Sequence, residues 1–395
     1  MLLSLALIIL CALVLSKAMT SVRMPALVGM ILTGIILGPS VLDVIDGSIL
    51  GISSEIRQMA LVVILIRAGL SIDFDDLRKV GRPAVLLSFV PATVEVVAIT
   101  VFAPMVFGIS WTDALVLGAV LAAVSPAVVV PRMIRLINQG YGQTRKVPHL
   151  VLAGASLDDV FVLVLFASFL RLATGEGMSA WSLVSLPLSI ALGVLSGLLT
   201  GEVFTRLVKA VHMRDTVKVL IMASIGFLFI VLEEVSGHSV PFSGLVAVIA
   251  FAAMILKRHQ VLAKRLVLKF EKIWVLAEIA LFVLVGAALD ITSAFDLGIM
   301  AAVFIILMLL IRSVGVLAAL IKSGLPWRER LFVVFAYLPK ATVQAAIGAV
   351  PLSMGLAGGQ TILTLAVLSI IITAPVGAVL VDLGHHKLLK ADLEV

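Results

Sequence analysis

The chain has 395 residues, of which 62% are hydrophobic and 13% are charged. Soluble globular domains carry about 25% charged residues, so the composition excludes a soluble protein and indicates a membrane protein surrounded by lipids. The net charge of +6 does not indicate a nucleic-acid partner, because the basic residues lie between apolar runs instead of along one face. The single cysteine, Cys11, excludes an intrachain disulfide and a cysteine-based metal cluster. We expect no cofactor.

Apolar runs bounded by charged residues, Gly or Pro follow one another along the whole chain. A bilayer core requires about 20 apolar residues per helix, so these runs predict an all-α polytopic membrane protein with about 13 transmembrane helices. The first run lacks the positive n-region of a signal peptide and is interpreted as a membrane helix. The predicted helices cover residues 2–17, 25–41, 57–71, 83–107, 113–131, 148–171, 182–206, 216–233, 240–256, 272–289, 297–321, 330–350 and 360–381.

The basic residues are distributed unequally between the two sides of these helices. Alternate connections and the C-terminal tail contain 24 of the 29 lysines and arginines, whereas the opposite connections contain 2. The positive-inside rule then places the N-terminus outside and the short tail 382–395 in the cytoplasm. The expected location is the inner (plasma) membrane of a prokaryote. The connections are short, so we expect no soluble regulatory domain.

The predicted helices divide into two units of five that enter the membrane from opposite sides. Residues 25–171 form repeat 1 and residues 240–381 form repeat 2. Linker helices lie between them in 182–233, and the helix 2–17 is additional. Such inverted repeats are typical of secondary transporters, so residues 1–395 are expected to form a single membrane transporter unit.

The fourth helix of each repeat is interrupted by proline and polar residues. Proline removes a helix hydrogen bond and frees a carbonyl group that hydrocarbon cannot satisfy. Interruptions at matching positions of two repeats indicate a binding site near the middle of the membrane. The residues of the two predicted breaks are Ser125, Pro126 and Pro131 in the first, and Pro339, Lys340, Thr342 and Gln344 in the second.

Charged residues within membrane helices are costly, by about 2.5–3.5 kcal/mol each on insertion scales, and usually mark transport pathways. We place seven charged residues at membrane depth: Arg67, Glu95, Asp158, Asp159, Glu278, Arg312 and Lys340.

Asp158 and Asp159 lie about halfway along the helix 148–171. Successive residues of a helix point about 100° apart, so one carboxylate can face an aqueous cavity while the other faces a partner helix. A partly hydrated carboxylate binds either a proton or a hard cation such as Na⁺, and competition between the two couples their movements. The pair therefore predicts cation/proton exchange.

Glu95 and Arg312 occupy matching helices of the two repeats, and we expect them to form an ion pair. Whether this pair is structural or gates the transport cycle stays open, because buried pairs often specify geometry without adding stability. Lys340 is a candidate partner for an aspartate. Arg67 and Glu278 are interpreted as members of structural pairs.

Two series of glycines recur at intervals of four residues, Gly193–Gly197–Gly201 and Gly34–Gly38. Small residues at this spacing allow helices to approach closely. We interpret both series as ordinary membrane helix packing.

Three motifs carry a resemblance to a known family: Ala155-Ser156-Leu157-Asp158-Asp159, Ser125-Pro126-Ala127-Val128-Val129-Val130-Pro131, and Pro339-Lys340-Ala341-Thr342-Val343-Gln344-Ala345-Ala346-Ile347-Gly348. With these motifs in this order, the sequence resembles the cation:proton antiporter-2 family, and within it the NHA-type sodium/proton antiporters. The resemblance covers essentially the whole chain.

The resemblance implies an inverted-repeat antiporter fold, with a core domain that contains two crossing broken helices and a separate dimerisation domain. It also implies elevator-type alternating access in a homodimer, with the helix 2–17 at the dimer interface. Asp159 would be the main carrier of Na⁺ and H⁺, and Asp158 the assisting carboxylate. Ser125, Ser156 and Lys340 would lie beside them.

One position departs from the electrogenic members of the family. Those relatives carry a lysine in the helix that matches 297–321, whereas this chain has Arg312. Arginine stays protonated under nearly all conditions, so it is not expected to carry a second proton. The stoichiometry, the choice between Na⁺ and Li⁺, and the partner of Asp158, either Lys340 or Arg312, remain open.

Three other functions are alternatives to Na⁺(Li⁺)/H⁺ exchange. A K⁺/H⁺ antiporter or K⁺ efflux transporter of the same family is the main alternative. An organic-anion symporter on a related scaffold fits adjacent acidic residues poorly. An intramembrane aspartyl protease needs two aspartates that face each other, whereas Asp158 and Asp159 are adjacent on one helix. No Walker, Rossmann or nucleophile-elbow motif is present, so we expect no enzyme.

Overall fold

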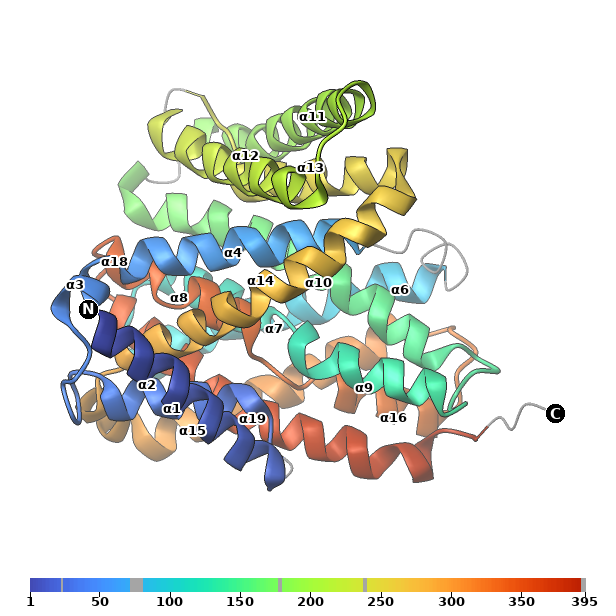
Figure 1. Ribbon diagram of the computed structural model, residues 1–395. Coiled ribbons are helices and arrows are strands. Elements are labelled where there is room, and N and C mark those ends of the chain that lie inside the picture. The colour runs from blue at the N-terminus through green and yellow to red at the C-terminus, as the bar shows by residue number, and fades with distance from the viewer. Residues whose placement is uncertain (23, 72–80, 177–179, 237–239, 392–395) are drawn as a thin grey trace. The chain divides into compact units, whose positions relative to one another are not determined.

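The computed structural model describes residues 1–22, 24–71, 81–176, 180–236 and 240–391 (Figure 1). All elements of these residues are helices, and a single isolated β-bridge pairs Tyr141 with Ala391 in the described chain. The all-α fold class is therefore confirmed. The chain forms two compact units: Met1–Ser54, Asp73–Val162 and Leu281–Val395 make the first, and Glu55–Ile72 and Leu163–Ala280 make the second.

The first unit contains most of the N-terminal and C-terminal helices. They are α1 (Leu2–Ser21), α2 (Ala26–Leu37), α3 (Gly47–Gly51), α6 (Arg82–Leu87), α7 (Val90–Phe107), α8 (Trp111–Ala122), α9 (Pro126–Asn138), α15 (Ile291–Ala319), α16 (Trp327–Ala336), α17 (Thr342–Ile347), α18 (Val350–Ser353) and α19 (Gly359–Leu388). α10 (Val147–Arg171) and α14 (Gln260–Ala287) contribute residues to both units.

The second unit contains most of α4 and the central helices. They are α4 (Ser53–Leu70), the π-helical turn Leu172–Glu176, α11 (Ala180–Ala210), α12 (Asp215–Ser236) and α13 (Gly244–Arg258). In this unit the ion pair of Arg67 is formed with Glu271, at 3.9 Å between Nη2 and Oε1. Glu271 lies two turns before Glu278 on α14.

Eight helical stretches of the described residues are long and apolar enough to cross a membrane. Two further apolar helices, Ala26–Leu37 and Thr342–Ser353, are shorter. Several helices also extend beyond the predicted apolar runs. α14 begins at Gln260 instead of residue 272, and α9 continues to Asn138 instead of ending at residue 131. Hydropathy marks only the apolar part of a helix, whereas polar turns at its ends remain helical in water.

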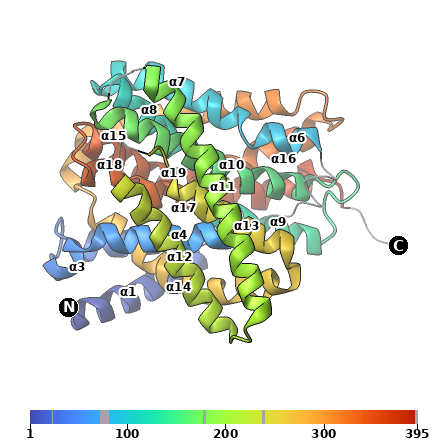
Figure 2. The same cartoon turned by 90° about the horizontal axis from the view of Figure 1, so that it is seen from above.

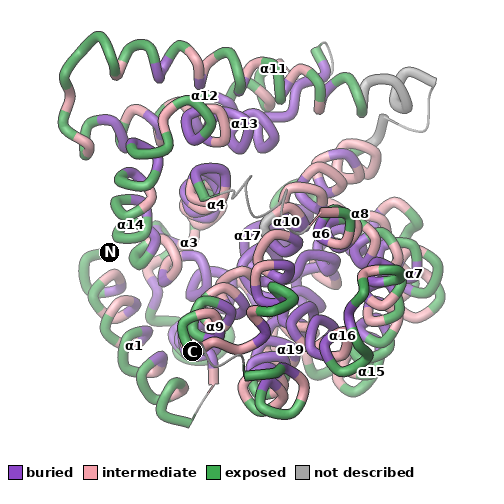
Figure 3. The backbone as a smooth tube through the Cα atoms, turned by 90° about the vertical axis from the view of Figure 1, so that its right-hand side faces the viewer, coloured by how far each residue is buried: buried purple, intermediate pink, exposed green. Residues whose placement is uncertain are grey.

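Both predicted interruptions are real breaks in helices. Between α8 and α9 the backbone is extended at Ala123 and Ser125, and Pro126 then occupies the first turn of α9, where its missing N–H costs nothing. Between α16 and α17 the residues 337–341 are not helical. α17 is buried along its whole length (Figure 3).

The glycine series in the second unit lets α11 approach α13, and the two helices pack side by side (Figures 1 and 2). A β-carbon added to Gly197 would overlap the Ala247 carbonyl oxygen and lie 2.8 Å from the Ala250 β-carbon. In the first unit, Gly34 and Gly38 pack in the same way against Val283 and Ala287 of α14. Both series therefore serve packing within the chain, as predicted.

Replacing Gly197 with leucine is expected to destabilise the protein. The side chain has no space between α11 and α13, and inserting carbon atoms into a packed interface typically costs about 1–3 kcal/mol or more. The loss is measured as a lower melting temperature of the purified protein in detergent. Val194→Leu on the exposed side of α11 is the control, and an equal loss in both variants would contradict close packing at Gly197.

Candidate functional site

The helix α10 places Asp158 and Asp159 at adjacent buried positions. Asp158 is fully buried and Asp159 is 7% exposed. The Asp158 Oδ2 atom accepts a hydrogen bond from the Val124 N–H at 2.8 Å. The Oδ1 atoms of both aspartates have no hydrogen-bond partner among the described residues. Unpartnered buried oxygens are uncommon, so the pair offers free ligand atoms.

The two helix breaks meet beside this pair. The Ser125 N–H of the first break donates to the Pro339 carbonyl of the second at 2.8 Å. The Lys340 N–H donates to the Thr373 hydroxyl of α19 at 2.8 Å. Because residues 123–125 are not helical, the Val124 N–H is free to bind Asp158 instead of a helical carbonyl. The breaks therefore supply backbone groups to the site, as a broken membrane helix can do only where protein covers it.

Side chains satisfy the carbonyl groups at the end of α8. Lys340 Nζ donates to the Leu121 carbonyl, Arg312 Nη1 to the Ala122 carbonyl, and Gln344 Nε2 to the Ala123 carbonyl at 2.9 Å. The last carbonyls of a helix have no partner within it, and cations are favourable at this negative end of the helix dipole. The first break is therefore stabilised by residues of α15 and of the second break.

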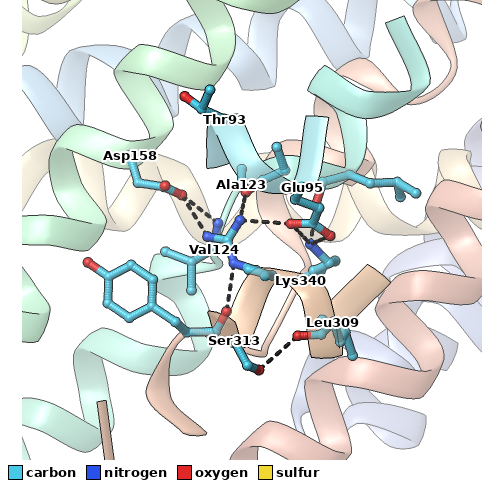
Figure 4. Close-up of polar contacts among 12 residues, drawn as sticks. Thr93, Glu95, Ala123, Val124, Asp158, Leu309, Ser313 and Lys340 are labelled. Carbon is cyan, nitrogen blue, oxygen red and sulfur yellow. Dashed lines mark hydrogen bonds and ion pairs between the residues drawn. The ribbon is translucent and has the colours of Figure 1, made fainter. Parts of the chain in front are cut away.

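Four charged side chains form one buried network (Figure 4). Arg312 Nη1 lies 2.8 Å from Glu95 Oε2, and Arg312 Nη2 lies 3.3 Å from Asp158 Oδ2. Lys340 Nζ lies 2.7 Å from Glu95 Oε1. Glu95 thus pairs with both cations, and the ion-pair partner of Asp158 is Arg312. Lys340, a sequence candidate for an aspartate partner, pairs with Glu95 in this structure.

Arg312 is fixed by more than its two carboxylates. Its Nε atom donates to the Tyr337 carbonyl at 3.1 Å, and its Cζ atom lies 5.9 Å from the centre of the Tyr337 ring. The planar guanidinium has five donors in a fixed fork, and three of its nitrogens are used in three directions here. A lysine at this position could not make the same set of contacts.

Other oxygen atoms near the breaks are also unpartnered. The Ser125 hydroxyl, the Thr342 hydroxyl and the Gln344 Oε1 atom are buried without hydrogen bonds among the described residues. Pro131 lies within α9, and Thr342 and Gln344 lie within α17, so these three predicted break residues are helical. Pro339 lies in the second break and packs against Gly377 of α19. Ser156, a predicted residue of the site, is part of α10, but its side chain lies outside the described part of the structure.

Sequence reasoning missed the backbone groups of the site, which are the Val124 N–H and the α8 carbonyls. It also missed Tyr337 and Thr373. Uncharged main-chain groups leave no mark in a sequence beyond the nearby prolines. Tyr337 stands two residues before Pro339, and that position is the only signal that could have indicated it.

The balance of charges distinguishes Asp159 from its neighbours. When all four groups are ionised, Glu95 and Asp158 contribute two negative charges and Arg312 and Lys340 two positive charges, so the paired network sums to zero. Asp159 forms no ion pair among the described residues. A buried carboxylate without an ion-pair partner is costly, so binding of one positive charge at Asp159 would lower the free energy of the site.

The chain matches known proteins over most of its length. The family model described as sodium/hydrogen exchanger, transmembrane, matches residues 4–382. Sodium/hydrogen exchanger 9B2 from Mus musculus is 32% identical over 380 residues, which cover 93% of this chain and 69% of the mouse protein. The Homo sapiens exchanger 9B2 is 32% identical over 391 residues, covering 95% of this chain and 71% of the human protein.

A solved structure shares the fold. The sodium proton antiporter MjNhaP1 from Methanocaldococcus jannaschii aligns with a TM-score of 0.82 at 19% sequence identity, over 97% of both chains. The resemblance to sodium/proton antiporters inferred from the motifs is confirmed at the level of the family, whose members are ion transporters and not enzymes. With its apolar helices and its match across residues 4–382, the chain is an integral membrane protein that belongs to the sodium/hydrogen exchanger family.

Proposed function

We propose that this protein is a secondary active antiporter that exchanges Na⁺ or Li⁺ for H⁺ at Asp159, with Asp158 assisting. The observation that carries the proposal is the pairing of the buried carboxylates. Asp159 has no ion-pair partner among the described residues, whereas the Asp158 carboxylate pairs with Arg312 at 3.3 Å. The names of the related exchangers support the same activity.

The proposed coupling follows from the cost of an unpaired buried carboxylate. Burial without a counter-charge is unfavourable, so Asp159 is stable only when it holds a proton or a cation. The two ligands use the same oxygens and exclude each other. Na⁺ and Li⁺ are hard cations that prefer oxygen ligands, and the free Oδ1 atoms of Asp159 and Asp158 supply them.

From the same charge balance we propose a stoichiometry for the exchange of cations and protons. Asp158 already has Arg312 and the Val124 N–H as partners, and arginine does not release its proton. One monovalent cation or one proton then neutralises the site, which predicts one-for-one, electroneutral exchange. This proposal depends on Asp158 keeping its partner throughout the cycle.

We further propose that the binding site is exposed alternately to each side of the membrane by an elevator-type movement within a homodimer. The proposal includes about 13 transmembrane helices in two inverted repeats, 25–171 and 240–381, whose broken helices cross. The contact between Ser125 and Pro339 supports a meeting of the two breaks. α1 is the proposed dimer contact, because its apolar residues Leu10 and Leu13 are exposed.

The proposed orientation rests on the distribution of basic residues. The N-terminus lies outside and the tail after residue 381 in the cytoplasm, by the positive-inside rule. We propose a prokaryotic inner (plasma) membrane, although the two exchangers 9B2 compared above are from mammals.

The decisive experiment measures ion choice and stoichiometry together. The purified protein is reconstituted in vesicles that contain a pH-sensitive dye, and Na⁺, Li⁺ or K⁺ is added with the membrane potential free or clamped at several values. We expect proton movement with Na⁺ and Li⁺ and an equilibrium that does not depend on the clamped potential. Proton movement driven by K⁺ alone would instead assign a K⁺/H⁺ antiporter of the same family. An equilibrium that shifts with potential would contradict the one-for-one stoichiometry.

A further inference from the structure

Tyr337 is a buried tyrosine of the first unit, in contact with the charged network. It is fully buried at the end of α16, where the second helix break begins. Its hydroxyl has no hydrogen-bond partner among the described residues. A buried donor without a partner is unfavourable, and phenylalanine would fill the same space without that cost. The hydroxyl is therefore available to a water molecule or an ion that enters the site.

The rest of Tyr337 supports the ion site directly. Its carbonyl accepts the Arg312 Nε–H at 3.1 Å, and its ring lies 5.9 Å from the Arg312 Cζ atom. Arg312 in turn pairs with Asp158. Tyr337 thus reaches Asp158 through one intervening side chain.

The hydroxyl end of the ring lies against α10, on the face that carries Asp158. A β-carbon added to Gly154 would overlap the Tyr337 hydroxyl oxygen and lie 3.4 Å from the ring carbon that bears it. Gly154 precedes Asp158 by four residues, which is one helical turn on the same face. The absence of a side chain at Gly154 therefore leaves room for the hydroxyl beside the aspartate.

Two buried polar groups without partners thus lie on this face. Tyr337 offers a donor, and the Oδ1 atom of Asp158 offers an acceptor. Both are fully buried, and the fixed contacts of Arg312 hold both in place. A buried water molecule makes two to four hydrogen bonds to polar groups that lack other partners. The Tyr337 hydroxyl and the Asp158 Oδ1 atom are two such groups.

We propose that Tyr337 is a positioning residue of the ion site. Its ring and carbonyl hold the Arg312 guanidinium. Its hydroxyl forms a hydrogen bond with a water molecule that accompanies the cation on the Asp158 side of the site. The proposal rests on the proposed exchange function and assigns to that site a group that sequence motifs do not indicate.

The test replaces Tyr337 with phenylalanine, which keeps the ring and the backbone carbonyl. We expect the half-saturating Na⁺ concentration to rise about fivefold, the effect of one ordinary hydrogen bond, with a shifted pH profile and a smaller change in maximal rate. The melting temperature should be unchanged or higher, because an unpartnered hydroxyl has been removed. An unchanged half-saturating concentration and pH profile, or a lower melting temperature, would overturn the proposal.

Tyr141→Phe is the matched control, since the chain contains 2 tyrosines. The Tyr141 hydroxyl bonds to His386 Nδ1 at 2.9 Å, away from the carboxylates, so its removal should not change Na⁺ affinity. Wild type and Asp159→Asn are measured in parallel. Failure of the wild type to exchange cations for protons, or exchange by the Asp159 variant, would contradict the proposed function, whereas a normal Tyr337→Phe variant beside an inactive Asp159 variant contradicts this inference alone.

A second pair of variants tests the contact at Gly154. Gly154→Ala should lower the melting temperature and weaken Na⁺ binding, because the methyl group displaces the hydroxyl. Combining it with Tyr337→Phe should recover most of the melting temperature, since the remaining ring carbon lies 3.4 Å away, although the Leu87 β-carbon at 3.0 Å stays tight. Equal losses of melting temperature with and without the hydroxyl would place it elsewhere and overturn the inference.

Discussion

Replacing Asp159 with asparagine is expected to abolish cation-dependent proton movement in reconstituted vesicles. Asparagine has nearly the same shape as aspartate. Its amide does not bind a proton near neutral pH and does not offer a charged oxygen to Na⁺. The neutral network of Glu95, Arg312, Lys340 and Asp158 stays intact, so folding should be preserved. The measurements are dye-detected proton flux after addition of Na⁺ or Li⁺, and the melting temperature in detergent.

The matched control is Asp113→Asn. Asp113 is another buried aspartate of the first unit, at the start of α8, where its Oδ2 atom accepts the Gly358 N–H at 3.2 Å. An asparagine oxygen can accept the same bond, so transport should continue. Near-normal exchange by the Asp159 variant would remove Asp159 from the carrier role.

Replacing Glu95 with glutamine is expected to reduce stability and expression more than it reduces turnover per folded molecule. Glu95 is fully buried and pairs with both Arg312 and Lys340. Its loss leaves two buried cations opposite one remaining paired carboxylate, and breaking a buried ion pair typically costs about 3–5 kcal/mol. The melting temperature and the yield of monodisperse protein are the measurements.

A double variant separates the charge effect from other causes. Glu95→Gln combined with Lys340→Gln restores neutrality between Arg312 and Asp158, so it should be more stable than Glu95→Gln alone. Glu202→Gln is a control, because Glu202 pairs with the exposed Arg206 and Arg258 and such surface pairs contribute little. A stable but inactive Glu95→Gln protein would instead place Glu95 in the transport reaction.

The sequence was sufficient to predict features that depend on residue type alone, such as charges within the membrane and helix breaks. Charged residues at membrane depth are expensive enough to be noticed individually, so Asp158, Asp159, Glu95, Arg312 and Lys340 were all identified. Prolines in apolar runs identified both helix breaks, since proline cannot continue the hydrogen-bond pattern of a helix. The chain's helical class followed from the length of its apolar runs.

The sequence was insufficient to predict ion-pair partners, because these depend on the directions in which side chains point. Spacing alone left both Lys340 and Arg312 as candidate partners of Asp158. The structure pairs Arg312 with Asp158, because the guanidinium on α15 spans from Glu95 to the aspartate, whereas the Lys340 ammonium ends at Glu95. Helix ends were also shifted, as at Gln260 of α14, because hydropathy does not register polar helical turns.

The amino-acid sequence by itself thus determined that this is a helical membrane transporter with a carboxylate pair beside two broken helices. Only the tertiary structure decided which charges neutralise one another and that Asp159 has no counter-charge within the described residues. It also revealed the Val124 N–H, the α8 carbonyls and the Tyr337 carbonyl as groups that bind the buried charged side chains. The physical reason is that a residue's charge and its helix-breaking tendency are local properties, whereas a hydrogen-bond partner is fixed by the distance and direction that the packed helices impose.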